Sequence, residues 1–354
     1  MNDSKNKLLA AAQVTDKSIV HCKKNSVIFR GKCAALVLIL LTFICLCAEG
    51  VVNDKPILVH YDGEWFVPIF KSYPETAFGG DFESEADYKD PYVLNMIEQS
   101  GWVTWPLVRY HYDTINYDLT YPSPPSKQNW LGLDDQGRDV FARLIYGLRI
   151  SLAFALVLTS AISVIALVTG TVQGYLGGWV DLIGQRLTEI WGAIPVMFVV
   201  MIVASILNPG FVTLTLVLAL FGWHYLAQLI RAEVLKTRQL EYVQSALIAG
   251  VSDFRIMWRH VLPNALITTL STLPFIFAGS LGSLITLDFL GFGLPVGYPS
   301  LGELIAQGKN NLHAPWLGMT GCGAILFVIT LVVLVGEAVQ EWLSPFKEHH
   351  HAQR

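Results

Sequence analysis

Residues 240–264, LEYVQSALIAGVSDFRIMWRHVLPN, decide the fold, because they form the longest charged interruption among the hydrophobic segments of the C-terminal two thirds. The apolar spacing predicts two short amphipathic helices, 241–249 and 254–261. Gly250 joins them, since glycine can adopt the positive φ that ends a helix, and Pro263 is expected to end the second helix. Docking of this pair into a groove on a partner is one use. A loop lying on its own membrane domain is the alternative, which periodicity leaves open. The apolar face of the second helix comprises Phe254, Met257, Trp258 and Val261.

This stretch resembles a cytoplasmic motif of the inner-membrane permeases of ABC importers: EAA, three residues, Gly, nine residues, I-x-L-P. The chain has Gln244-Ser245-Ala246, three residues, Gly250, nine residues, then His260-Val261-Leu262-Pro263. The spacing matches throughout, and the sequence departs at Gln244, Ser245 and His260. In that family this loop is the coupling helix that docks on the ATPase subunit. The resemblance therefore implies an ATPase-coupling loop made of Glu241, Tyr242, Gln244, Ser245, Ala246, Gly250, Phe254, Met257, Trp258, His260, Leu262 and Pro263.

The composition indicates a membrane protein. Hydrophobic residues make up 53% of the chain, charged residues make up 15%, and the mean hydropathy is +0.47. Apolar stretches near the roughly 20 residues needed to cross a bilayer recur along the sequence. The net charge of -4 gives no reason to expect a nucleic-acid partner. We predict an all-α polytopic protein with six transmembrane helices at residues 33–48, 151–176, 187–207, 211–230, 265–287 and 316–337.

Charge distribution predicts the orientation of these spans. Residues 1–32 and 231–259 are basic, with seven Lys/Arg against two acids and five against three, whereas residues 49–127 have 13 Asp/Glu against five Lys/Arg. By the positive-inside rule both basic segments and both termini are cytoplasmic. The predicted organisation is a cytoplasmic segment 1–32, a first span 33–48, a periplasmic lobe 49–136, a permease core 137–345 that includes the coupling loop 231–263, and a cytoplasmic tail 346–354.

The periplasmic lobe is expected to be β-rich, since residues 56–61 and 65–70 read as strands among many aromatic residues. After it, residues 140–150 have an amphipathic pattern with three arginines around it, which predicts a helix lying at the outer interface before the second span. Asp139 and Arg143 are placed to form an i,i+4 ion pair on this helix.

Three polar residues near or within spans are candidates for lining a solute pathway: His224, Gln228 and Asp288. Polar groups are costly in lipid and usually face protein or a cavity. His224 and Gln228, four residues apart, either line a pathway or bond a neighbouring helix. Asp288 lies at the end of a span, where capping positions are usual.

No catalytic or metal site is evident. The sequence lacks a G-x-x-x-x-G-K-[ST] phosphate loop, an H-E-x-x-H pair, a G-x-S-x-G elbow and any Cys/His set with metal spacing. The chain is therefore expected not to be an enzyme and to carry no cofactor. By the family resemblance, ATP and magnesium belong to partner ATPase subunits.

Two further segments resemble the dipeptide/oligopeptide branch of these permeases. They are the run LG-x-DD-x-GRD at 131–139 with its continuation to Gly178, and LDFLGFGLP at 287–295 followed by PSLGELI at 299–305. Together with Asn53-Asp-Lys-Pro, they are similar to the C-type permeases of microcin C (Yej-type) peptide importers. This implies a type I importer fold in the bacterial inner membrane. It also implies a second permease subunit in a heterodimer, ATPase subunits, a periplasmic peptide-binding protein, a peptide substrate and contact with membrane lipid.

Two other classes of protein compete with this hypothesis. A channel or secondary transporter would act without an ATPase, but should show charged residues deep in its spans, and no interior charge pair is evident. A membrane-anchored adhesion or scaffold protein would use the lobe, but would need neither five further spans nor a docking loop.

Overall fold

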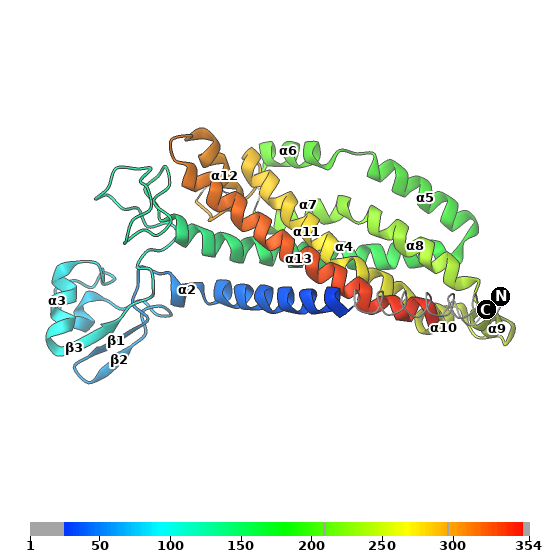
Figure 1. Cartoon of the computed structure of the whole chain (residues 1–354), viewed down its shortest axis with the longest axis horizontal. Helices are drawn as coiled ribbons and strands as arrows, with labels where there is room; N and C mark the ends of the chain where they lie inside the picture. The colour runs from blue at the N-terminus through cyan, green and yellow to red at the C-terminus, as the bar shows by residue number, and fades with distance from the viewer. Residues whose placement is uncertain (1–24, 208–209, 296, 350–354) are drawn as a thin grey trace, which may run out of the picture.

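The computed structural model describes residues 25–207, 210–295 and 297–349. The predicted N-terminal segment as far as residue 24, the tail from residue 350, and part of the outer turn at 208–210 lie outside the described residues. Long helices run side by side to form an elongated bundle. A small lobe lies at one end, and the segment labelled α9 and α10 lies at the other (Figure 1).

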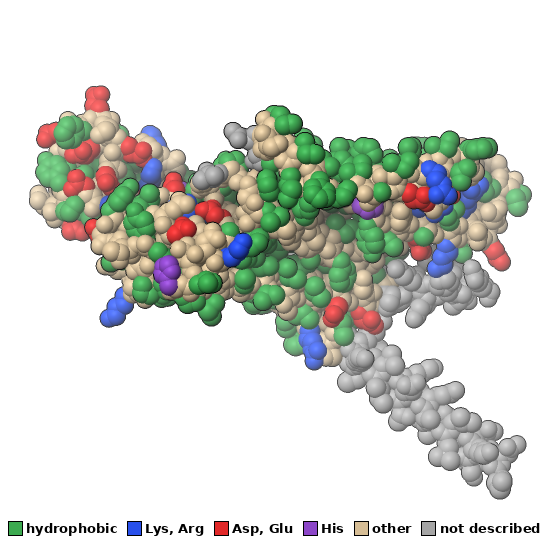
Figure 2. Space-filling view, turned by 90° about the horizontal axis from the view of Figure 1, so that it is seen from above, with side chains coloured by type: hydrophobic (Ala, Val, Ile, Leu, Met, Phe, Trp, Pro, Cys, Tyr) green, Lys and Arg blue, Asp and Glu red, His purple; other side chains and the backbone are tan. Residues whose placement is uncertain are grey.

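The six predicted spans correspond to four long helices and two bent pairs. The long helices are Asn25–Leu46, α4 (Val140–Leu176), Asp253–Leu290 and Pro315–Leu343, the last lying within α13 (Pro315–His349). One pair is α5 (Gly178–Gly192) with α6 (Val196–Ile206), bent by 63°. The other is α7 (Phe211–Gly222) with α8 (His224–Arg238), bent by 41°. Hydrophobic side chains cover the middle of the face in Figure 2, whereas charged side chains gather toward the two ends.

The predicted interfacial helix at 140–150 is wrong as a separate element. α4 is one continuous helix of 37 residues. Its sequence contains no proline to break it, and Arg143, expected on a wet face, is fully buried. The expected pair between Asp139 and Arg143 is also absent. Asp139 instead caps α4 by accepting from the Ala142 N–H at 2.8 Å, and accepts from the Asn129 side chain at 2.7 Å.

Pro263 does not end a helix, contrary to the prediction. The helix runs from Asp253 to Leu290, as α10 (Asp253–Ile256), a π turn (Met257–Val261) and α11 (Leu262–Leu290). Pro263 lies inside this continuous helix, directly after the π turn. The wider π turn before it accommodates the ring that would clash with an ordinary helical carbonyl.

The lobe between the first helix and α4 is a mixed α/β unit rather than β-rich. Its antiparallel sheet has the order β2-β1-β3, built from β1 (Leu58–Tyr61), β2 (Glu64–Phe66) and β3 (Gly101–Thr104). Helix α3 (Pro91–Ser100) and a 3-10 turn (Glu75–Phe78) accompany the sheet. Aromatic residues of strands β1 and β2, Tyr61 and Phe66, pack edge-to-face on buried Phe78 and join the sheet to the rest of the lobe. The short helix α2 (Ala48–Val51) links the lobe to the bundle.

Two glycines of α4 set its closest contact with another helix. A Cβ at Gly170 would lie 2.6 Å from the Ala227 carbonyl oxygen, and one at Gly174 would lie 2.8 Å from Val234 Cγ1. α4 and α8 therefore approach closely only because these positions lack side chains, as expected for a small-xxx-small pair in a membrane. The contact fixes α8, and with it His224, against the centre of the bundle.

Candidate functional site

The predicted coupling loop forms a compact helical hairpin at one end of the bundle. Helix α9 (Glu241–Ile248) is followed by Gly250 with φ +75°, and the chain re-enters helix at Asp253. The N–H groups of Gly250 and Val251 donate to the carbonyls of Leu247 and Ala246, each at 3.1 Å. This pattern satisfies the free carbonyls at the end of α9 and requires a left-handed residue, which glycine adopts without strain.

The hairpin has an inner and an outer apolar face. Val243, Ile256 and Val261 are fully buried in the main core, which they share with α4, α8 and α11. Ile248, Phe254 and Trp258 are 87%, 70% and 64% exposed, and the two aromatic rings stack at 6.3 Å. The predicted single face is thus divided, because Val261 packs inward while Phe254 and Trp258 face outward. Of the other predicted loop residues, Glu241, Tyr242, Gln244, Ser245, Gly250 and Pro263 are exposed, and Ala246, Met257, His260 and Leu262 are half-buried.

Three polar contacts tie this hairpin to the helices beside it. The Tyr175 hydroxyl at the end of α4 donates to Asp253 at 2.8 Å. The Gln244 side chain donates to the Arg238 carbonyl, and the Asn264 side chain donates to the Tyr242 hydroxyl, both at 2.8 Å. Partial desolvation of its hydroxyl raises the pKa of Tyr242, although the residue as a whole is exposed. With its buried inner face, the hairpin is a rigid extension of the bundle rather than a loose loop.

A cavity of about 860 Å³ opens where α7 and α8 meet α11, near the bend between α5 and α6. His224 lines it, whereas Gln228 is exposed and does not line it. A role of His224 in a solute pathway stays a prediction. Asp288 is also absent from its wall. Its carboxylate accepts from the Leu294 N–H at 2.8 Å and the Ser300 hydroxyl at 2.5 Å, so it holds the turn after α11. The structure therefore separates the three candidates and places one of them at a cavity.

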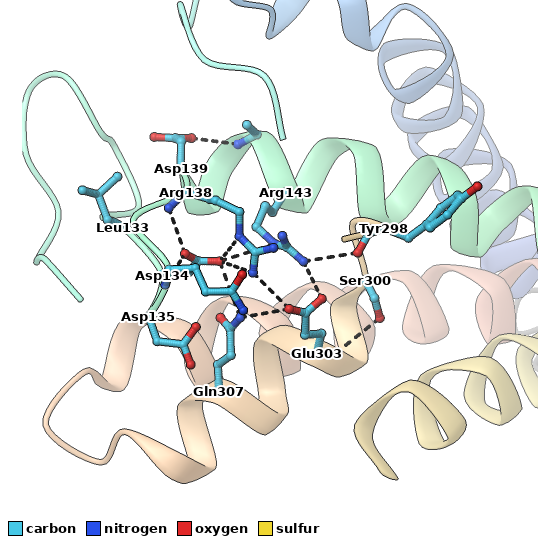
Figure 3. A network of polar contacts seen from close by, with 12 residues as sticks. Leu133, Asp134, Asp135, Arg138, Asp139, Arg143, Tyr298, Ser300, Glu303 and Gln307 are labelled. Atoms are coloured by element: carbon cyan, nitrogen blue, oxygen red, sulfur yellow. Dashed lines mark hydrogen bonds and ion pairs between the residues drawn. The ribbon is translucent and has the colours of Figure 1, made fainter. Parts of the chain in front are cut away.

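A buried polar cluster, defined by Asp134, Arg138, Arg143, Glu303 and Gln307, lies at the lobe end of the bundle (Figure 3). Arg143 Nη2 lies 2.6 Å from Glu303 Oε2, and its Nε lies 3.6 Å from Asp134 Oδ2. Arg138 bridges the same two acids, at 2.7 Å from Asp134 and 3.0 Å from Glu303. Gln307 donates to Glu303 at 3.1 Å. The cluster fastens the segment before α4 to α12 (Leu301–Asn310).

Electrostatics in this cluster follow from burial and charge pairing. Burial lowers the pKa of Arg138, but the charges of Asp134 and Glu303 outweigh it and raise the pKa overall. Burial raises the pKa of Asp135, and the neighbouring Asp134 carboxylate raises it further. Sequence reasoning singled out both segments of this cluster but not their contact, since Arg143 and Glu303 are 160 positions apart. Across the part of the chain that the structure describes, no group of three His, Cys, Asp or Glu residues could hold a metal ion.

Comparison with known proteins gives consistent similarities. Residues 163–349 match the family described as binding-protein-dependent transport system inner membrane component. The chain is 47% identical over 320 residues to the inner membrane ABC transporter permease protein YejE of Escherichia coli K12, covering 90% of this chain and 94% of that one. It is 44% identical over 344 residues to the peptidoglycan transport system permease protein YejE of Agrobacterium fabrum, covering 90% of each. The oligopeptide transport system permease protein OppC of Lactococcus lactis subsp. cremoris is 32% identical over 235 residues, covering 65% of this chain and 80% of that one.

Proposed function

The chain belongs to the family of inner membrane components of binding-protein-dependent transport systems, and from this membership we propose that it is the permease subunit of an ABC importer for peptides. Its helical architecture, with as many as six spans, is that of a type I importer permease. The relatives carry names of oligopeptide, dipeptide and peptidoglycan transport. We propose oligopeptides or microcin C-like peptides as the substrate class. A channel or secondary transporter acting without an ATPase has no support among the relatives.

The mechanism that we propose is alternating access driven by partners. Binding of ATP and magnesium closes the ATPase subunits, and the α9–α10 hairpin follows them. The spans of this chain and of a second permease subunit then open outward to a periplasmic binding protein that carries peptide. Because the inner face of the hairpin is part of the bundle core, movement of the hairpin must move α4, α8 and α11. This chain contributes half of the pathway and no catalytic group of its own.

One observation carries the coupling role: the outer face of the hairpin exposes Ile248, Phe254 and Trp258 together at one end of the bundle. Exposed large apolar and aromatic side chains, here with the Phe254 and Trp258 rings stacked, are typical of protein interfaces. The patch belongs to the segment that carries the family motif and lies at the end opposite the lobe (Figure 1). A groove on an ATPase subunit is the occupant that we propose, by helix-in-groove docking.

Affinity purification of the tagged full-length chain from membranes tests the proposed assembly. We expect a second permease subunit and a protein with a Walker-type nucleotide motif to copurify in constant ratio. ATP hydrolysis by this material should rise when peptide-loaded binding protein is added. A chain that purifies alone and transports peptide without ATP would contradict the proposal and favour a secondary transporter.

The proposed orientation places the termini and the hairpin in the cytoplasm and the lobe in the periplasm. Single cysteines at Ser84 and Ser252, both exposed, in a chain lacking its native cysteines should react with membrane-impermeant reagents from opposite sides. The cysteine at position 84 should react in intact spheroplasts. The cysteine at position 252 should react only in inverted vesicles, since positive charge near the hairpin keeps the hairpin inside. Reaction of both residues from the same side would refute this topology.

A further inference from the structure

Two interrupted spans bring their breaks to the same cavity. One break separates α5 from α6 with a bend of 63°, and the other separates α7 from α8 with a bend of 41°. Non-helical backbone at membrane depth is tolerated where it is buried in protein or lines a water-filled cavity, and interrupted helices commonly build solute sites. The breaks contribute Gly192, Ile194, Val196, Phe221, Gly222 and His224 to the cavity wall.

These breaks are fastened to each other and are not independent kinks. The Trp191 indole N–H donates to the Leu220 carbonyl at 2.7 Å, which satisfies a carbonyl near the end of α7. The Trp191 ring also stacks on Phe221, with centroids 5.2 Å apart and planes 14° apart. The end of α5 and the end of α7 therefore form one structural unit around the cavity.

Hydrogen bonding fixes which nitrogen of His224 carries the proton. Its Nδ1 lies 2.8 Å from the Phe221 carbonyl oxygen. A carbonyl can only accept, so Nδ1 is the donor, and in the neutral ring Nε2 is left as an acceptor. Among the described residues none is hydrogen-bonded to Nε2. A Cβ at Gly192 would lie 3.3 Å from Nε2 and 3.0 Å from Cδ2, so glycine leaves room beside this edge of the ring.

The wall of the cavity is mostly apolar, carries a few polar side chains and has no charged one. Among the residues that line it there is no Asp, Glu, Lys or Arg, while α11 supplies the hydroxyl-bearing side chains Thr272, Ser280 and Ser283. The Thr272 and Ser283 hydroxyls donate to carbonyls of their own helix, so their oxygens are left as acceptors. An uncharged wall with such acceptors suits the N–H groups of a peptide backbone. Fixed charges would instead select particular side chains. A partner helix, the other possible occupant, has its interior amide groups satisfied internally and would offer no backbone N–H to the Nε2 acceptor.

We infer that the paired breaks form a peptide-binding site, in which His224 Nε2 accepts a hydrogen bond from a backbone N–H of the transported peptide. This inference rests on the proposed function and adds to it a recognition chemistry based on backbone amides. It makes His224 a specificity-determining residue, which discriminates between peptide positions with and without an N–H.

The test compares His224→Ala with the wild-type importer, reconstituted with its partners and supplied with saturating loaded binding protein. The substrates are one peptide and a series in which a single backbone nitrogen is methylated in turn. Taking the ratio of variant to wild-type rate for each peptide cancels any effect of methylation on the binding protein. We expect a fall of about two- to thirteenfold with the unmethylated peptide, the range for one lost hydrogen bond. We expect a ratio near one for the single peptide whose methyl group removes the donor.

Two further variants complete the experiment. His224→Gln should recover most of the rate, because its side-chain oxygen can accept at a similar position. Gln228 lies one turn further along the same helix and outside the cavity. The variant Gln228→Ala should therefore give a ratio of variant to wild-type rate near one for every peptide. The same loss by His224→Ala with all methylated peptides would overturn the inference and leave His224 as a brace for Phe221. In a chain carrying Ser283→Cys, a photoreactive peptide should become cross-linked at this position. Cross-linking of the second permease subunit there instead would also overturn the inference. Absence of ATP-dependent uptake by the wild type would instead refute the proposed function, and this site with it.

Discussion

Replacing Gly250 with aspartate is expected to abolish peptide uptake while leaving the chain in the membrane. Gly250 is exposed at the tip of the hairpin, and a Cβ there would meet no atom within 4 Å. The cost within the isolated subunit is the backbone strain of φ +75°, which aspartate tolerates better than most residues. The carboxylate would enter the proposed interface beside Ile248 and Phe254. An unpaired buried charge costs about 3 kcal/mol or more, which corresponds to more than about 100-fold weaker docking. Loss of ATPase copurification with normal membrane abundance is the measurement.

Two substitutions at the same position separate charge from backbone strain. Gly250→Asn has nearly the same shape as aspartate, lacks the charge and tolerates positive φ. It should keep most of the uptake. Gly250→Val adds no polar group but resists φ +75°, and should lower both uptake and stability of the hairpin. Equal loss by the aspartate and asparagine variants would contradict the role assigned to charge. Full assembly and uptake by Gly250→Asp would show that this hairpin is not the coupling element.

The second large effect is expected at the buried polar cluster. Arg143→Met keeps most of the side-chain volume but leaves the Asp134 and Glu303 carboxylates facing one guanidinium, that of Arg138. Removing one partner of a buried ion pair costs about 3–5 kcal/mol. We therefore expect a clear fall in the thermal unfolding midpoint of the purified chain. Glu303→Gln in the same chain should restore part of the loss, because it removes the excess negative charge beside the single remaining guanidinium.

Arg149→Met is the matched control for this prediction. Arg149 lies in the same helix and pairs with Glu49 at 2.5 Å, but both side chains are 37% exposed. Exposed pairs contribute roughly 0–1 kcal/mol, so this variant should unfold close to the wild-type midpoint. Equal midpoints for Arg143→Met and Arg149→Met would contradict the structural role given to the buried cluster.

The spans could be predicted from the sequence because hydrophobic runs near the length needed to cross a bilayer indicate membrane-spanning helices. Pro195 lies at the break between α5 and α6, where proline cannot continue a regular helix. The same rule gave a wrong end at Pro263, because the rule does not anticipate a π turn just before the proline. The break at Trp223 was not predicted, since neither proline nor a polar run marks it.

The position of the hairpin in the chain could be predicted from the sequence, but which of its faces is buried and which is exposed could not. The family motif located the hairpin, whereas apolar spacing alone cannot distinguish a surface that packs on its own core, as Val261 does, from one left for a partner, as at Trp258. Arg143 was misplaced for a related reason. An arginine on an amphipathic pattern indicates a wet face unless an acidic partner is known, and Glu303 comes from a distant segment.

Peptide-stimulated ATP hydrolysis by the assembly in lipid vesicles tests the central claim most directly, which is that this subunit couples peptide delivery to a partner ATPase through the α9–α10 hairpin. With the wild-type chain, loaded binding protein should raise the hydrolysis rate above that with empty binding protein. When the Gly250→Asp chain takes the place of the wild-type chain, with the same amount of protein in the vesicles, this stimulation should disappear. Stimulation of equal size with both chains would contradict the account, since hydrolysis would then respond to peptide without the hairpin.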